Sequence, residues 1–225
     1  MTTILIADDH PLFRDALQRA VLAVMPQVEL REAASVQALV ELAEQYPHAD
    51  LLLLDLNMPG AHGFSALAHM RAAFPALPVV VVSAREEPAL MRRAIGHGAA
   101  AFIPKSATLE TIREALVAVF DGEIWLPPGV MAQGTALDPE EEAIARRIAE
   151  LTPQQYRVLT MVCNGLLNKQ IAYELNVSEA TIKAHMTAIL RKLGAHSRTQ
   201  AVLIAGRLTL EGRGTPPPAD EDEFD

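Results

Sequence analysis

The sequence predicts an α/β domain built on a doubly wound parallel sheet, followed by a smaller all-α domain. In the first half of the 225-residue chain, four short apolar runs lack polar alternation, which is typical of strands buried on both faces of a parallel sheet. Between residues 151 and 205, helix-capping residues and helical periodicity recur instead. Proline and glycine residues separate the two halves and indicate a linker.

Each apolar run is followed by a polar residue with a use in phosphate chemistry. The runs cover residues 4–7, 51–54, 79–82 and 99–103, and they lead into Asp8 and Asp9, into Asp55, into Ser83, and through Pro104 into Lys105. In open parallel sheets, functional side chains gather at the carboxyl ends of the strands. We therefore expect three carboxylates, a hydroxyl and an ammonium group to meet at one edge of the sheet.

This set of side chains predicts a magnesium-dependent phosphoryl site. Clustered carboxylates repel one another and favour a hard cation such as Mg²⁺, which takes oxygen ligands in octahedral geometry. Asp9 and Asp55 can ligate the ion directly, and Asp8 can hold a metal-bound water. The ion, Lys105 and Ser83 would then neutralise and orient phosphoryl oxygens around a nucleophilic carboxylate. Asp55 is the predicted nucleophile because it stands alone after the most uniformly apolar run.

Four segments resemble the motifs of receiver domains in bacterial two-component response regulators. They are Ala7 to His10, Leu54 to Gly60, Val82 to Ala84 and Phe102 to Ser106. The resemblance implies a five-stranded, flavodoxin-like receiver domain over residues 1–121 and a sensor histidine kinase as partner. It also implies roles for individual residues: Asp55 as phosphoacceptor, Asp8 and Asp9 as the acidic metal pair, the backbone carbonyl of Asn57 as a further metal ligand, Ser83 and Phe102 as switch residues, and Lys105 as the phosphate-binding lysine.

Two residues depart from the commonest receiver pattern. Ser106 follows Lys105 where many receivers have proline, which leaves the isomer of that peptide bond open. Phe102 lacks the hydroxyl of the tyrosine often found there, so it could change rotamer without forming a hydrogen bond. Outside the pattern, we expect His10 to be a loop residue rather than a ligand. The single cysteine, Cys163, is expected to be a packing residue.

Composition and charge favour an intracellular protein that contacts DNA through one segment. A single cysteine excludes a disulfide framework, no apolar stretch approaches the ~18–20 residues that span a bilayer, and the chain starts without a basic signal region, so we expect a cytoplasmic location. The net charge is −9, but residues 151–205 hold six Lys and Arg against two Asp and Glu. A phosphate backbone would respond to this local charge of +4 rather than to the total.

The borders of the basic segment are visible in the sequence. We expect a helix at about 109–120, a linker over residues 122–147, and a disordered acidic tail over residues 211–225. Late in the linker, Asp138 and Pro139 start a helical stretch with acidic residues in its first turn.

The segment after this linker predicts three helices in a helix-turn-helix plan. Thr152 caps a helix that reaches about Gly165, Asn168 caps a second that ends at Leu175, and Ser178 caps a third. At about 100° per residue, the third helix divides into two faces. The core stripe comprises Ile182, Met186, Ile189 and Leu193. The opposite face comprises Ala180, Lys183, Ala184, Thr187, Ala188 and Arg191, and is small, polar and basic. Such a face can enter the major groove of DNA closely.

This part of the chain resembles the LuxR-type DNA-binding domain, which we assign to residues 148–210. The matching segments are 151–153, 168–172, 175–178, 181–185 and 191–194. The resemblance implies base contacts from Lys183, Ala184 and Thr187, phosphate contacts from Lys169, Thr181 and Lys192, and pairing of two copies through a final helix at about 197–208, with Val202, Ala205 and Leu208 as contacts. Gln155 replaces the usual glutamate, so a salt bridge of the family is expected to be missing. His185 is expected to pack or to contact the DNA backbone.

Together the two resemblances predict a response regulator of the NarL/FixJ class. It would be a transcriptional regulator rather than an enzyme, phosphorylated on Asp55 and bound to promoter DNA as a dimer. The main alternative is a constitutive DNA-binding regulator whose receiver domain works without phosphorylation. A phosphatase of the haloacid dehalogenase type is a weaker alternative, because it needs a second aspartate where this chain has Asn57.

Overall fold

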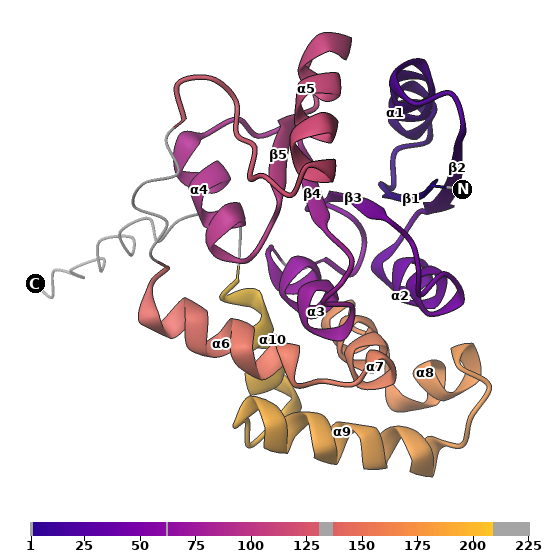
Figure 1. Ribbon diagram of the computed structural model, residues 1–225. Helices are drawn as coiled ribbons and strands as arrows, with labels where there is room; N and C mark the ends of the chain where they lie inside the picture. Colours follow the sequence, from indigo (N-terminus) through magenta and orange to yellow (C-terminus); the bar gives the residue numbers. More distant parts are fainter. Residues whose placement is uncertain (1, 62, 131–136, 209–225) are drawn as a thin grey trace, which may run out of the picture.

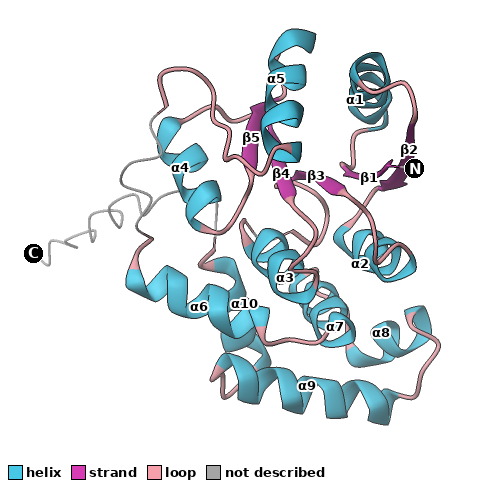
Figure 2. Cartoon of the chain, in the orientation of Figure 1, coloured by secondary structure: helices cyan, strands magenta, loops and turns pink. Residues whose placement is uncertain are grey.

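The computed structural model describes residues 2–61, 63–130 and 137–208, and its first half is a three-layer α/β domain (Figure 1). Five parallel strands lie in the order β2-β1-β3-β4-β5 (Figure 2). The strands are β1 (Thr2–Ala7), β2 (Val28–Ala33), β3 (Leu51–Asp55), β4 (Val79–Ser83) and β5 (Ala101–Pro104), and the helices between and after them are α1 (Pro11–Val24), α2 (Val36–Gln45), α3 (Ser65–Ala73), α4 (Pro88–Gly96) and α5 (Leu109–Phe120). The predicted doubly wound fold is confirmed.

Both faces of the sheet are covered by helices, which explains the uninterrupted apolar runs. Successive residues of a strand point to opposite faces. In β1, Ile4 and Ile6 pack with residues of α1 and α5, whereas Leu5 and Ala7 pack with residues of α2, α3 and α4. The edge strand β2 is buried only at Val28 and Ala33, so its sequence carries no apolar run.

Five helices form the second half of the described chain: α6 (Pro139–Ala149), α7 (Pro153–Cys163), α8 (Asn168–Glu174), α9 (Glu179–Leu193) and α10 (Arg198–Gly206). Two of the predicted caps are present. The Thr152 hydroxyl accepts a hydrogen bond from the backbone N–H of Gln155, whose side chain accepts one in return, which is a capping box. The hydroxyl of Ser178 accepts from the N–H of Thr181.

The predicted cap at Asn168 is wrong by one residue. Leu167 takes the N-cap position of α8, and Asn168 is the first helical residue. The carboxamide oxygen of Gln170 accepts a hydrogen bond from the Leu167 N–H at 2.7 Å. A side chain from the first turn of the helix therefore satisfies the backbone N–H of the N-cap residue. The Asn168 side chain instead accepts a hydrogen bond from Arg198 at 3.3 Å.

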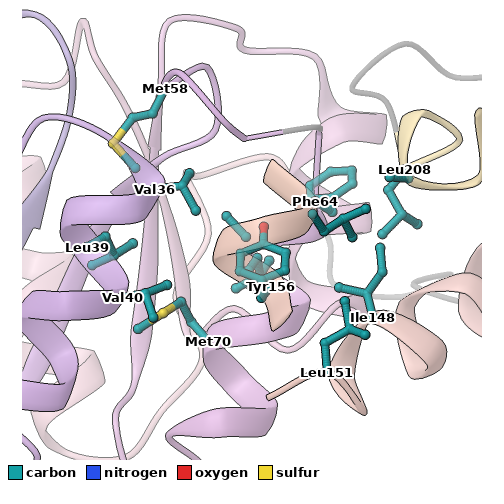
Figure 3. Packing of buried hydrophobic residues seen from close by; sticks show 14 of the residues in the cluster. Val36, Leu39, Val40, Met58, Phe64, Met70, Ile148, Leu151, Tyr156 and Leu208 are labelled. Carbon is teal, nitrogen blue, oxygen red and sulfur yellow. The ribbon is translucent and has the colours of Figure 1, made fainter. Parts of the chain in front are cut away.

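The two domains pack against each other through Tyr156 of α7. Helix α6 lies against α3 and α7 lies against α2, and one hydrophobic cluster runs through both domains. The Tyr156 hydroxyl lies 3.1 Å from Ser65 Oγ, and its ring stacks on His69 with the centroids 4.0 Å apart. Figure 3 shows the tyrosine among apolar side chains of both domains, with Met70 from the first domain and Ile148 from the second. Tyr156 is therefore part of a core shared by the two domains.

Ion pairs surround this apolar centre. Arg157 of α7 pairs with Glu41 of α2. On the other side, the Glu141 carboxylate of α6 lies 2.9 Å from Arg93 and 2.6 Å from His97, two residues at the end of α4. Glu141 has only 12% of its side chain exposed, so this contact is well shielded from solvent. The end of α4 is thereby tied to the helix that precedes the predicted DNA-binding segment.

The packing of the two domains leaves α9 accessible to solvent but buries part of the α10 region. Helix α9 lies on the side of the second domain that faces away from the sheet (Figure 1). In α10 and just after it, two of the three expected pairing residues, Ala205 and Leu208, are fully buried within this single chain, and Val202 is half-buried. The carbonyl of Leu208 accepts a hydrogen bond from the N–H of Phe64 at 2.8 Å.

Buried His69 makes the stability of this packing dependent on pH. Burial lowers the pKa of His69 to about 4, whereas an unfolded chain binds that proton with a pKa near 6.5. The stability from neutral His69 is therefore present above pH 6.5 and is lost as the pH falls toward 4. We expect wild-type protein to lose about 2 kcal/mol of unfolding free energy through this group between pH 7.5 and 5. Chemical denaturation of wild type and His69→Phe at both pH values measures the loss; an equal loss in the variant contradicts the assignment.

Candidate phosphoacceptor site and DNA-facing helix

The carboxyl edge of the sheet brings together the polar residues predicted from the apolar runs. Asp55 is the last residue of β3, Asp8 follows β1, and Lys105 follows β5. The Lys105 ammonium lies 2.6 Å from Asp8 Oδ2 and 2.9 Å from Asp55 Oδ2. Both aspartates are 1% exposed. Two nearly inaccessible carboxylates are thus held by one cation at the end of the sheet.

The charges at this site are not balanced by protein groups alone. Burial raises the pKa of Asp55, and the hydrogen bond and charge of Lys105 oppose that rise. Burial would by itself lower the pKa of Lys105, but its hydrogen bonds to Asp8 and Asp55 outweigh this effect and raise it. Side-chain ligand atoms of Asp8, Asp9, Asp55 and His10 all lie within 4.8 Å of one another. Three carboxylates beside one ammonium form a donor set that fits a divalent cation with oxygen ligands.

His10 lies in the loop before α1, as expected, but its ring contacts the acidic pair. Its Nδ1 is 2.8 Å from Asp9 Oδ1 and 3.3 Å from Asp8 Oδ1, while 64% of the side chain is exposed. The backbone N–H of His10 also donates to Asp8 Oδ1 at 2.8 Å. This residue therefore orients the carboxylate of Asp8 through its main chain.

Backbone groups fix the remaining parts of the site. The N–H of Asn57 donates to Asp55 Oδ1 at 3.2 Å, so both carboxylate oxygens of Asp55 have a partner. Ser83 is completely buried, and its hydroxyl accepts from the N–H of Arg85 at 3.2 Å. Its carbonyl accepts from the N–H of Lys105 at 2.7 Å, which ties the ends of β4 and β5 together.

Both departures from the receiver pattern are resolved in the structure. Phe102 is completely buried, so its ring occupies an inward position. The described residues contain no cis peptide bond, and the bond between Lys105 and Ser106 is therefore trans. The Ser106 hydroxyl donates to Glu86 at 2.5 Å, which links the loop after β5 to the loop after β4.

Helix α9 presents the face predicted for DNA contact. The core stripe is confirmed, since Ile182, Met186, Ile189 and Leu193 are the buried residues of this helix. Lys183, Ala184 and Thr187 are exposed. The Lys183 ammonium lies 3.2 Å from the carboxylate of Glu179, and the Thr187 hydroxyl donates to the Lys183 carbonyl at 3.0 Å. Both contacts lie within α9 itself.

The residues predicted to contact phosphates differ in their surroundings. Lys169 is exposed, and the Thr181 hydroxyl lies 2.8 Å from Ser178 Oγ. The Lys192 ammonium donates to the Glu150 carbonyl at 2.8 Å and to the Gln155 carboxamide at 2.7 Å. Gln155 therefore accepts a hydrogen bond from a charged ammonium, although it cannot form the salt bridge of the family, and the sequence did not reveal this contact. His185 is half-buried at the edge of the core stripe.

The chain belongs to the response regulators with a LuxR-type DNA-binding domain. Residues 4–117 match the response regulator receiver domain, and residues 149–205 match the bacterial regulatory proteins of the luxR family. The chain is 41% identical over 211 residues to a glycerol metabolism activator of Pseudomonas putida, covering 92% of this chain and 96% of the relative. It is 31% identical over 202 residues to the nitrate/nitrite response regulator NarL of Escherichia coli K12, covering 89% and 93%.

Solved structures show the same fold. An RcsB chain from a structure of two dimers on two parallel DNAs aligns with a TM-score of 0.54 at 23% identity, covering 92% of this chain and 99% of that one. A second RcsB–DNA complex aligns with a TM-score of 0.53, also at 23% identity, with the same coverage. Within the residues that the structure describes, no helix has the length and apolar character needed to cross a membrane.

The acidic cluster predicts stabilisation by Mg²⁺. A divalent cation at the site relieves repulsion among Asp8, Asp9 and Asp55 in the folded chain, so it should raise the thermal midpoint. Asp9→Asn removes one charge and one ligand and should need several-fold more Mg²⁺ for the same rise. Asp15→Asn, an exposed acid on α1, is the matched control and should titrate as wild type. Thermal unfolding across a Mg²⁺ series measures the effect; identical titrations for Asp9→Asn and wild type would refute the site.

Proposed function

We propose that this response regulator accepts a phosphoryl group on Asp55 from a sensor histidine kinase and then binds promoter DNA as a dimer to alter transcription. The observation that carries the proposal is the convergence of Asp8, Asp55 and Lys105 at one edge of the sheet. The same chain presents a basic helix face with an exposed Lys183. We place its action in the cytoplasm, where promoter DNA is accessible.

The residues support transfer to a carboxylate. Mg²⁺, held by Asp9, Asp55 and the Asn57 carbonyl, with Asp8 on a bound water, would neutralise charge on the phosphoryl oxygens. A carboxylate oxygen of Asp55 would attack phosphorus, so that a P–O bond forms and the P–N bond of the phosphohistidine breaks. The donor imidazole leaves and takes up a proton. The Lys105 ammonium would exchange its contact with the Asp55 carboxylate for a phosphoryl oxygen.

Two routes lead from this site to the second domain. The first runs through buried Ser83 and Phe102 to α4. Arg93 of this helix and His97 just after it hold Glu141. We propose that phosphorylation moves the end of α4 and weakens this clamp. Because Glu141 lies on α6, loss of the clamp would loosen the helix that packs on α3.

The second route is the loop that follows Asp55. Gly60 has φ +86°, and a Cβ added there would lie 3.4 Å from the Cβ of Thr160 on α7. The carbonyl of Pro59 also accepts a hydrogen bond from the N–H of Val36 at 3.2 Å, which links this loop to the start of α2. A displacement of the loop would therefore act directly on the domain interface.

The exposure of α9 and the burial of the α10 region indicate that the proposed phosphorylation would control pairing of two copies rather than access to the DNA-contacting helix. The face of α9 that carries Lys183, Ala184 and Thr187, which we call the reading face, is exposed, so DNA could reach it without any change in domain packing. Leu208, an expected pairing residue, is buried and its carbonyl is bound to Phe64 of the receiver domain. We propose that phosphorylation frees the α10 region for pairing. Lys169, Thr181 and Lys192 stay predicted phosphate contacts, and Lys192 would have to leave Gln155 to serve as one.

The exposed reading face also favours the alternative of a constitutive DNA-binding regulator. In that case a single copy could bind one half-site without phosphorylation. The acidic residues beside Lys105 support the phosphorylation-dependent form instead, because carboxylates and a lysine gathered at one place are the groups that magnesium-dependent phosphoryl transfer uses.

Asp55→Asn tests both forms. The substitution exchanges a carboxylate for a near-isostere, so the fold should persist while the gain of one phosphoryl mass from Mg²⁺ and a small phosphodonor disappears. Phosphodonor should strengthen DNA binding by wild type and leave the variant unchanged. Intact mass and gel-shift titrations measure the two effects. Phosphorylation of the variant at the wild-type rate refutes the assignment of Asp55, and equal DNA binding by wild type with and without phosphodonor supports the constitutive form.

Lys183→Ala tests the reading face. Loss of a base contact should cost about 1–3 kcal/mol on the cognate site and relax the base preference at one position of each half-site. Lys169→Ala, a predicted phosphate contact, should instead weaken binding to all sequences alike and lower the salt slope by roughly one unit. Binding of both variants to cognate and scrambled duplexes over a salt series separates the two roles. If Lys183→Ala weakens both duplexes equally, the reading face is misplaced.

A further inference from the structure

The Lys105 ammonium has an aromatic neighbour in addition to its two carboxylates. The ring centroid of Phe13, on the first turn of α1, lies 4.4 Å from Lys105 Nζ. This distance is within the range in which a cation is attracted to the negative face of an aromatic ring. Phe13 and the stem of Lys105 also line one crevice between α1 and α5, together with Leu17, Ile103, Leu109 and Ile112. With 15% of its side chain exposed, Lys105 is largely shielded on this side.

The partners of Lys105 would change during the phosphorylation cycle. Before the reaction its charge is shared between Asp8 and Asp55. A bound cation would compete for the same carboxylates, and phosphorylation would convert the Asp55 carboxylate into an acyl phosphate, whose negative charge lies on the phosphoryl oxygens. The ring of Phe13 takes part in neither change, because it binds no metal and accepts no phosphoryl group. It is therefore a contact that can hold the ammonium in every state of the cycle.

We propose that Phe13 is a positioning residue for phosphoryl transfer, which holds the Lys105 ammonium over the site by a cation–π contact. The inference rests on the proposed role of Lys105 as the phosphate-binding lysine. A flexible four-carbon lysine stem has many rotamers, and a fixed ring on α1 removes those that point to solvent. Phe13 and Lys105 also line the same crevice, so the ring lies beside the space that the lysine side chain occupies.

The competing role for Phe13 is that of a spacer between α1 and α5. In that role any apolar side chain of similar volume would serve, and the electronic character of the ring would have no effect. A cation–π contact depends on the quadrupole of the ring, which fluorination of the ring edge weakens and then reverses with little change of shape. Stepwise fluorination at this position therefore separates the two roles.

The experiment replaces Phe13 of the full chain with mono-, di-, tri- and pentafluorophenylalanine and follows phosphorylation of Asp55 by intact mass with Mg²⁺ and a small phosphodonor. A cation–π contact predicts a rate that falls stepwise with the number of fluorines. The total loss should reach about two- to fivefold for a partly exposed pair. The same series at Phe74, half-buried at the end of α3, is the matched control and should leave the rate unchanged.

Two further readouts make the result specific to Lys105. In a double-mutant cycle, Phe13→Leu should slow wild type and have no added effect on Lys105→Met, which keeps the stem but not the charge. By NMR, the ε-methylene protons of Lys105 should show an upfield ring-current shift that persists with Mg²⁺ and beryllofluoride and is lost in Phe13→Leu. A rate that is independent of fluorination, or an equal loss in the Lys105→Met background, overturns the inference and leaves the proposed function standing. Failure of wild type to gain a phosphoryl mass overturns both.

Discussion

The structure depends on a charge imbalance at the carboxyl edge of the sheet. Two carboxylates, Asp8 and Asp55, are almost completely withdrawn from water and share a single ammonium, that of Lys105, while Asp9 adds a third negative charge nearby. Removing charges from water is costly unless they are paired, so the cluster fits a divalent cation, whose charge would also offset that of the proposed phosphoryl group. The parallel sheet makes this arrangement possible, because it brings distant segments of the chain to one edge.

The consequences of that imbalance reach the DNA-binding domain because the two domains share a core. Tyr156 is as deeply buried as the strands, and its partners Ser65 and His69 lie on the helix that follows the phosphoacceptor loop. On the α4 side, Glu141 ties the second domain to the segment that follows Ser83, the predicted switch residue. A structural change at the site would therefore reach the interface at two points, which is the physical route that we propose from phosphorylation to DNA binding.

Much of the fold and the residues of the candidate site could be predicted from sequence because their signals are local. Buried strands give apolar runs, and a helix with one buried face repeats every 3.6 residues. The resemblance implied a fifth strand, but β2 could not be located from its own residues, since an edge strand buries little and keeps polar residues such as Glu29 and Arg31. Tyr156 stacks on His69 and Phe13 contacts Lys105, and the members of each pair lie far apart in the chain. Such contacts could not be predicted from residue type or from spacing in the sequence.

We propose that phosphorylation of the receiver domain loosens its packing against the DNA-binding domain. The most direct reporter is the backbone N–H of Phe64, which donates across the interface to the carbonyl of Leu208. Hydrogen exchange of this amide should become faster when Mg²⁺ and beryllofluoride occupy the Asp55 site, whereas the amide of Tyr46, bonded to Leu42 within one domain, should keep its protection. Unchanged protection at Phe64, in protein whose affinity for DNA has risen, would contradict the account.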